Sequence, residues 1–289
     1  MSFASLKKSS GSVAKLTKEL EKLSSKGGGN GPDDRLWKPE VDKAGNGYAV
    51  IRFLPAPTGE ELPWAQVWSH AFQGTGGWYI ENSLTTLGQN DPVGELNRVL
   101  WNSGIDSDKD VARKQKRKLS YFSNILVVKD PLHPENEGRV FLYKYGKKIH
   151  DKLVEAMKPQ FEDEEPINPF DFWKGADFKL KITRVAGFWN YDKSEFAESS
   201  TLGDFKDKEL EAIWKDEYSL TAFTADDQFK SYEDLKLRLE TTLKGNYSKP
   251  VDQEEFEQLA TPTPVAAETP EPKEEEDTLS YFAQLAKDD

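Results

Sequence analysis

Short runs of strand-forming residues, separated by glycine, proline and asparagine, constrain the fold of this chain more than any other feature. Such punctuation is typical of short strands joined by turns. We expect strands over residues 48–54, 66–72, 77–81, 119–128, 138–145 and 178–182. Apolar residues at helical spacing predict helices over 92–101, 146–157, 206–214 and 231–243, with Ser231 capping the last helix. The predicted fold class is therefore mainly β with inserted helices, an α+β protein.

Aromatic residues make up 12% of the sequence, which is a high share for a chain of this kind. Many short strands, few helices and this aromatic content together favour a small β-barrel. Among small barrels, the oligonucleotide-binding (OB) type is a five-stranded, partly open form with a binding face. We therefore predict an OB-fold five-stranded barrel core that carries a helical and loop subdomain.

Two segments that favour flexibility flank the region that can fold. Residues 27–32 read Gly-Gly-Gly-Asn-Gly-Pro, which predicts a flexible linker after a basic arm at residues 1–26. From residue 261 to 277 the composition shifts to proline, threonine, alanine and glutamate, which cannot bury enough apolar surface to fold. We predict a core over 32–248 and a disordered acidic tail over 249–289.

The net charge of −12 is unevenly distributed along the chain. Residues 251–289 hold 12 acidic residues and 2 lysines, a net charge of −10, whereas residues 113–152 hold 11 basic and 4 acidic residues, a net charge of +7. Residues 1–26 hold 6 lysines and 2 glutamates, a net charge of +4. Such asymmetry indicates an anionic ligand for the basic blocks and an interaction role for the tail.

Several classes of function are disfavoured by the residues that are missing. The chain has no cysteine, which excludes disulfides, thiolate metal ligands and a cysteine nucleophile. None of the 3 histidines stands in a metal or nucleophile motif, and there is no phosphate-binding glycine loop. No apolar run is long enough for a membrane span or a secretory signal. We expect an intracellular binding protein with no catalytic residues and no membrane partner.

The candidate binding residues share a pattern in which cations stand beside aromatic rings. They are Lys114, Lys116, Arg117, Lys118, Tyr121 and Phe122, then Tyr143, Tyr145, Lys147 and Lys148, and finally Phe188 and Tyr191. Cations neutralise phosphates and flat rings stack on unpaired bases, so the pattern is typical of proteins that bind single strands. Nothing in these residues tests for a 2′-hydroxyl group, and a single-stranded RNA-binding regulator stays the alternative.

At these motifs the chain resembles the single-stranded DNA-binding, helix-destabilising proteins of T-even-type tailed phages. The matching segments keep the same order and cover residues 44–55, His70 with 78–81, 116–131, 134–149 and 187–192. The resemblance implies an OB-fold core with a groove for single-stranded DNA, a basic arm for cooperative self-association, and an acidic tail. It implies that the tail recruits the phage DNA polymerase, helicase loader and primase in the host cytoplasm. The implied roles are DNA replication, recombination and repair.

The resemblance also implies roles for particular residues. Those carried over to DNA contact are Arg52, Lys116, Arg117, Lys118, Tyr121, Phe122, Tyr143, Phe188 and Tyr191. By itself, Arg52 reads as a solvent-facing residue of a strand. In the arm, Lys7, Lys8, Ser9 and Ser10 resemble the family's short basic-serine motif and are expected to mediate self-association.

The family pattern includes a zinc site made of one histidine and three cysteines, in a subdomain that corresponds to about residues 66–112 here. His70 matches the histidine, whereas Ser83, Asp91 and Gly94 stand at the cysteine positions. Serine and glycine do not replace thiolates, and one histidine with one aspartate is not a tetrahedral site. We therefore predict that the family zinc is lost and that the chain has no cofactor.

Overall fold

The computed structural model describes residues 33–161, 163–244 and 249–250. Its strands are β1 (Leu36–Trp37), β2 (Gly47–Phe53), β3 (Ala65–Gly74), β4 (Gly77–Asn82), β5 (Lys118–Lys129), β6 (Val140–Tyr145), β7 (Ala176–Val185), β8 (Phe188–Asn190), β9 (Glu195–Ser199) and β10 (Lys249–Pro250). Its α-helices are α3 (Pro92–Asn102), α4 (Asp106–Lys114), α5 (Lys147–Met157), α6 (Asp207–Lys215) and α7 (Tyr232–Thr242). Short 3₁₀ turns lie at η1 (Pro134–Asn136), η2 (Thr221–Thr224) and η3 (Asp226–Gln228). The predicted arm and the tail from residue 251 lie outside the described residues.

The six predicted strands correspond to β2 to β7, and the four predicted helices correspond to α3, α5, α6 and α7. The hydroxyl of Ser231 accepts a hydrogen bond from the backbone N–H of Asp234, which confirms the predicted N-cap of α7. Helix α4 and strands β1, β8, β9 and β10 were not predicted, because α4 is almost entirely polar and the four strands are short. Strand β10 stands at residues 249–250, where the disordered tail was predicted to begin.

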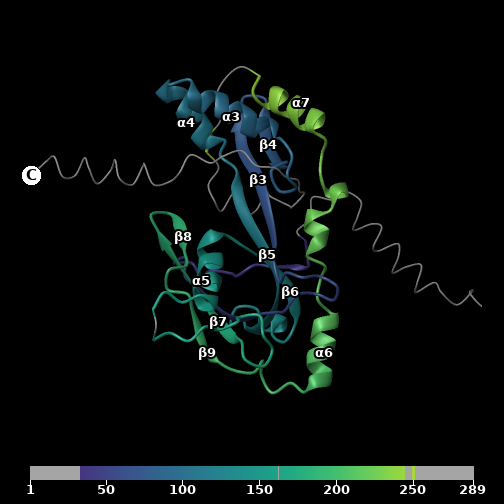
Figure 1. Ribbon diagram of the computed structural model, residues 1–289. Coiled ribbons are helices and arrows are strands. Elements are labelled where there is room, and N and C mark those ends of the chain that lie inside the picture. The colour runs from purple at the N-terminus through teal and green to yellow at the C-terminus, as the bar shows by residue number, and fades with distance from the viewer. Residues whose placement is uncertain (1–32, 162, 245–248, 251–289) are drawn as a thin grey trace, which may run out of the picture. The chain divides into compact units, whose positions relative to one another are not determined.

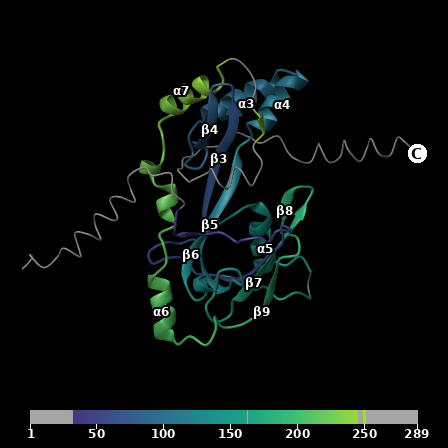
Figure 2. The same ribbon diagram turned by 180° about the vertical axis from the view of Figure 1, so that it is seen from behind.

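The strands form a mixed sheet in the order β1-β6-β5-β2-β7-β8, in which the β1–β6 pair is parallel and the other ladders are antiparallel. Strand β5 is shared between neighbours: it pairs with β3 near its start, with β6 in the middle and with β2 near its end. Figures 1 and 2 show β4, α3, α4 and α7 gathered at one end of β3 and β5, and α5, α6, β7 and β9 at the other end. This arrangement is an α+β fold. Within the described residues no ladder joins β7 or β9 to β6, and the OB-type barrel stays a prediction.

The two faces of β5 have different neighbours. Tyr121, Ile125 and Val127 point into the main hydrophobic cluster together with residues of β2, β6 and β7. Phe122 points to the opposite face, where its ring stacks on that of Phe223 with the centroids 4.3 Å apart. Because side chains alternate along a strand, each face of β5 keeps its character along the whole strand.

Residues after β9 cover the face of the sheet that carries Phe122. Helix α6 packs through Leu210 and Trp214 on a cluster that contains Leu126, and η2 supplies Phe223. Helix α7 packs on β4 and α3 in a further cluster. This second face is therefore covered, whereas part of the Tyr121 face is open. None of the helices described is long and apolar enough to cross a membrane.

Candidate nucleic-acid interface

The face of β5 that carries Tyr121 continues beyond the core onto an open surface. Tyr121 lies opposite Gln66 of β3, and Leu119 lies opposite Trp68. Gln66 is exposed, and Trp68 and Leu119 are half-buried. The face of β5 that lines the main cluster therefore extends directly into a solvent-facing part of the β3–β5 ribbon, and we call this part the open face.

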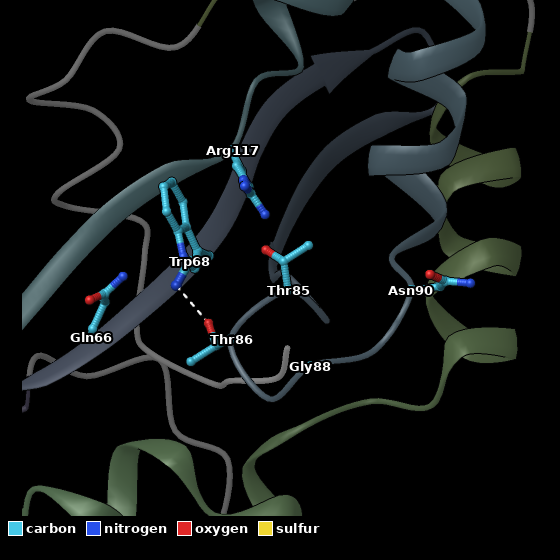
Figure 3. Close-up of a pocket in the computed structure, with 7 residues that line it drawn as sticks. All are labelled: Gln66, Trp68, Thr85, Thr86, Gly88, Asn90 and Arg117. Atoms are coloured by element: carbon cyan, nitrogen blue, oxygen red, sulfur yellow. Dashed lines mark hydrogen bonds between the residues drawn. The ribbon is translucent and has the colours of Figure 1, made fainter. Parts of the chain in front are cut away.

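Arg117 and Trp68 form the centre of the open face. The guanidinium carbon of Arg117 lies 4.2 Å from the centroid of the Trp68 ring, which is a cation–π contact. Both residues line an open pocket of about 830 Å³ together with Gln66, Thr85, Thr86, Gly88 and Asn90. Figure 3 shows Trp68 and Arg117 side by side, with Thr85 and Thr86 across the pocket from them.

The first turn of α5 supplies a second basic element. It holds Lys147 and Lys148, has no acidic residue, and is preceded by Gly146, which makes no side-chain cap. Cations at a helix N-terminus are repelled by the helix dipole, so this composition is unfavourable unless an anion binds there. The lysines pair with Asp151 and Asp192 at 2.9 and 3.0 Å, and all four side chains are more than half exposed. Exposed pairs of this kind contribute about 0–1 kcal/mol, and phosphates can replace the carboxylates at little cost.

Tyr121 connects α5 to the open face. Its ring stacks on His150 with the centroids 3.8 Å apart and the planes inclined by 10°. Burial lowers the pKa of His150 and raises that of Tyr121, so both rings stay neutral near pH 7. Because Gln66 lies opposite Tyr121 in the ladder, the route from the Arg117 pocket to the start of α5 is continuous.

The β7–β8 hairpin borders α5 on its other side (Figure 1). Phe188 at the tip of the hairpin is 49% exposed, while Tyr191 is half-buried against the main cluster. Lys148 reaches the carboxylate of Asp192, just beyond β8. The structure therefore brings Lys147, Lys148, Phe188 and Tyr191 into one neighbourhood beside Tyr121.

Arg52 lies in a different environment from the one expected. Its side chain is fully buried and makes an ion pair of 2.8 Å with Asp177. The guanidinium also donates to the backbone carbonyls of Asp171, Ser200 and Thr201 and to the Ser200 hydroxyl. Arg52 therefore does not face solvent, and a bound DNA strand cannot reach its side chain. It joins β2 to β7 and to the segment after β9.

Four of the predicted aromatic residues are also buried, and Tyr121, whose ring stacks on His150, is one of them. Tyr143 and Tyr145 share one face of β6, as their spacing predicts, but that face points into the main cluster. The Tyr145 hydroxyl is hydrogen-bonded to that of Ser123, and burial raises the pKa of Tyr145. Phe122 is enclosed on the opposite face by Phe223. These rings pack in the core beneath the interface and are not part of its exposed surface.

The remaining basic residues surround the start of β5. Lys114 ends α4, and Lys114 and Lys116 are exposed. Lys118 is half-buried and lies opposite Ser69, on the other side of the ribbon from Leu119 and Trp68. The self-association residues Lys7, Lys8, Ser9 and Ser10 lie outside the described residues.

Sequence reasoning missed Gln66, Trp68 and His150 as parts of this surface. A signal was present in β3, where Gln66 and Trp68 alternate with the buried residues Ala65, Val67 and Ser69. An aromatic residue on the polar side of an alternating strand is a candidate contact residue.

The positions that match the family's zinc ligands do not fit a metal ion. The carboxylate of Asp91 already accepts hydrogen bonds from the Ser83 hydroxyl and from the backbone N–H groups of Leu84, Val93 and Gly94. The ring of His70 lies between Asp91, with Nε2 3.3 Å from Oδ1, and the carbonyl oxygen of Gln115, 2.8 Å from Nδ1. No group of three or more metal-binding side chains occurs in the described part of the chain. The donor set lacks the sulfur ligands of a structural zinc site, and Asp91 caps α3 instead.

The electrostatics of this buried group are dominated by Asp91. Burial alone would raise its pKa, but the attraction and hydrogen bond of His70, together with the N–H groups of Gly94 and Leu84, lower it to about 2. Asp91 is therefore ionised at neutral pH and holds the loop before α3 in place.

Comparison with known proteins identifies the family. A family model described as "gp32 DNA binding protein like" matches residues 45–243. The chain is 40% identical over 230 residues to the single-stranded DNA-binding protein of Enterobacteria phage T2, a match that covers 78% of this chain and 76% of the relative. It is 39% identical over 229 residues to the single-stranded DNA-binding protein of Enterobacteria phage T4, with the same coverage of 78% and 76%. These matches confirm the resemblance and the expectation of a non-enzymatic protein, and the chain belongs to the gp32-like family of DNA-binding proteins.

Proposed function

We propose that this chain binds single-stranded DNA in phage DNA replication, with little sequence preference. The observation that carries the proposal is the path from Arg117 and Trp68, over the buried ring of Tyr121 and past the half-buried His150, to Lys147 and Lys148. Rings and cations alternate along it, as stacking on bases and neutralisation of phosphates require. The names of the phage relatives support the same ligand.

The proposed contact set is smaller than the one predicted from the sequence. It keeps Lys114, Lys116, Arg117, Lys118, Lys147, Lys148, Phe188 and Tyr191, and it adds Gln66 and Trp68. Tyr121 contributes through its stacked position under the surface, whereas Arg52, Phe122, Tyr143 and Tyr145 maintain the fold. We also propose that β2, β5, β6, β7 and β9, which surround the main cluster, form a partly open OB-type barrel.

We propose that the acidic tail competes with DNA for the basic residues around β5. The supporting geometry is the position of β10, which pairs with β3 so that Pro250 lies opposite Phe72. Strand β4 occupies the other edge of β3 at this point, so β10 lies on the edge where Lys118 pairs with Ser69. At Pro250 the antiparallel strand β10 runs along β3 in the direction of Ser69, the partner of Lys118, which lies three residues of β3 or about 10 Å away.

The remaining roles follow from the family resemblance and extend this proposal. The arm at residues 1–26, with Lys7, Lys8, Ser9 and Ser10, would mediate cooperative self-association on DNA. The tail, once displaced by DNA, would recruit the phage DNA polymerase, helicase loader and primase in the host cytoplasm. Protection of single strands by the same surface would serve recombination and repair. No cofactor takes part in any of these roles.

The test is a titration of the full chain with single-stranded DNA, duplex DNA and single-stranded RNA over a range of salt concentrations. We expect preference for single strands and a log–log salt slope of about −0.7 per phosphate neutralised. Equal affinity for duplex DNA would contradict the proposal, and tighter binding of RNA than of DNA would favour an RNA-binding regulator.

Matched lysine variants locate the phosphate contacts. Lys147→Ala and Lys148→Ala should each reduce the salt slope by about 0.7. Lys208→Ala is the control, because Lys208 is an exposed lysine of α6, away from the proposed surface. A slope that changes equally in all three variants would show that only net charge matters.

A further inference from the structure

Trp68 has no role in the hydrophobic core. It belongs to none of the four hydrophobic clusters that the described residues form, although it is half-buried. Its ring lines the pocket of about 830 Å³ and carries the guanidinium of Arg117 at 4.2 Å. An aromatic side chain at the wall of an open pocket, beside polar groups, is a candidate contact for a ligand.

The pocket wall opposite the Trp68–Arg117 pair is a loop that is fixed in place. The backbone N–H of Trp68 donates to the Thr86 hydroxyl at 2.8 Å, and its carbonyl accepts from the N–H of Ser83 at 2.9 Å. Further along, Asp91 accepts from Ser83 and from the N–H of Leu84. The loop is therefore tied to β3 at one end and to the start of α3 at the other.

We propose that this pocket is a subsite for one nucleobase of the bound strand, which stacks on the Trp68–Arg117 pair. A single-stranded base offers a flat face for the indole ring and the guanidinium, and its edge can hydrogen-bond to polar groups such as the Thr85 hydroxyl. The volume lies within the range of about 300–1,000 Å³ of small-molecule sites, and the pocket is lined by polar as well as aromatic groups. The proposal rests on the single-stranded DNA binding proposed above and specifies where one base lies.

The fixed loop contributes to affinity as well as to shape. A wall that is already ordered costs less entropy when a base binds than one that must be ordered by the base. Asp91 holds this wall through Ser83 and Leu84 and is therefore a positioning residue. Asp91 and Ser83, which stand at the family's zinc-ligand positions, thus hold the pocket wall by hydrogen bonds and not through a metal ion.

The primary experiment compares Trp68→Ala, Trp68→Phe and Trp173→Ala in the full chain. Trp173 is the matched control because it is 56% exposed and packs edge-on against Phe172, far from the pocket residues in sequence and contacts. With a short oligothymidylate, Trp68→Ala should bind about 10-fold to 100-fold more weakly, which corresponds to the stacking of one base. Trp68→Phe should keep most of the affinity, and Trp173→Ala should match the parent chain.

Two further measurements separate stacking from charge and from folding. On an abasic strand of the same length, the difference between the parent chain and Trp68→Ala should disappear, while the salt slope stays unchanged in both. In the parent chain, a strand containing 5-bromouracil should give a photochemical cross-link at Trp68, identified by mass spectrometry. This cross-linking measurement uses only the parent chain, so it does not depend on whether a variant folds.

The outcomes distinguish the subsite from the function on which it rests. Preference for single strands with unchanged affinity in Trp68→Ala and no cross-link at Trp68 would overturn the subsite and leave the proposed function standing. Loss of affinity that persists on the abasic strand would also overturn it, because the loss would then not involve a base. Absence of single-strand preference in the parent chain would overturn the proposed function itself.

Discussion

Replacement of Arg52 tests whether this residue is a structural clamp or a DNA contact. The family resemblance places Arg52 in contact with DNA, whereas the structure buries it completely between Asp177 and the backbone around Ser200. Arg52→Leu removes the guanidinium and keeps an apolar side chain in the buried space. We expect this variant to lose stability and to keep the DNA affinity of each folded molecule.

The magnitude follows from the partners that Arg52 would leave behind. Loss of one partner from a buried ion pair costs about 3–5 kcal/mol. Asp177 is 29% exposed and can be partly hydrated, which favours the lower end of that range. The carbonyl of Ser200 loses its hydrogen bonds from the guanidinium as well, at about 1 kcal/mol. For a core of this size, the combined loss of about 4 kcal/mol lowers the melting temperature by roughly 8–16 °C.

The assay combines thermal unfolding with DNA binding well below the melting temperature, corrected for the active fraction by stoichiometric titration. Arg98→Leu is the control, because Arg98 is an exposed arginine of α3. Arg52→Lys should recover part of the stability, since it keeps the charge but not the forked donors. An unchanged melting temperature together with weakened DNA binding in Arg52→Leu would refute the clamp and restore the sequence-based interpretation.

Three other predictions concern stability. Burial, followed by repulsion from Glu60, raises the pKa of Glu217 to about 8, so stability falls as pH rises from about 4.5 to about 8. Glu217→Gln should therefore raise the free energy of unfolding in urea by roughly 3 kcal/mol near pH 7 and leave it unchanged near pH 4. An increase that does not depend on pH would contradict this reasoning. Ala186 has a φ of +52° in the β7–β8 turn. Because asparagine tolerates that conformation, Ala186→Asn should raise the melting temperature by roughly 2–4 °C. A lower melting temperature would show that the turn is not strained. Asp91→Asn keeps the cap of α3 but loses the charge facing His70, and it should lower the free energy of unfolding in urea by about 2 kcal/mol. Unchanged stability would show that the Asp91 charge does not hold the loop before α3. Metal analysis of the parent chain should find no bound zinc.

The elements with clear periodicity could be predicted from the sequence, because local spacing determines them. Strand β7 is an example, since Phe178, Leu180 and Ile182 are buried and alternate with partly exposed residues. Helix α4 could not be predicted in this way. Its residues are mostly charged, and Ile105 gives it no side-chain cap, so only its contacts with α3 indicate why it forms.

The candidate site was harder to predict because exposure depends on distant parts of the chain. The spacing of Tyr143 and Tyr145 shows that they share a face, but not that β2 and β7 cover it. Arg52 is buried by Asp177, which lies 125 residues away, and no local pattern reveals that partner. The cationic residues were easier, because Lys147, Lys148 and Lys116 are exposed in the structure, as charged residues usually are.

The burial of most predicted aromatics has a mechanical consequence for the interface. Tyr121 stacks on His150 above and on Tyr145 below, and Tyr145 stacks in turn on Tyr143 within the core. A close-packed column of rings transmits displacement rather than absorbing it, because protein interiors have low compressibility. The start of α5, with Lys147, is therefore held at a fixed position relative to Gln66 and the Trp68 pocket. Phosphate contacts at α5 and base contacts at β3 are then held at a fixed spacing along the bound DNA strand. A substitution that loosens the packing of Tyr145 should therefore weaken both kinds of contact, although Tyr145 itself does not touch DNA.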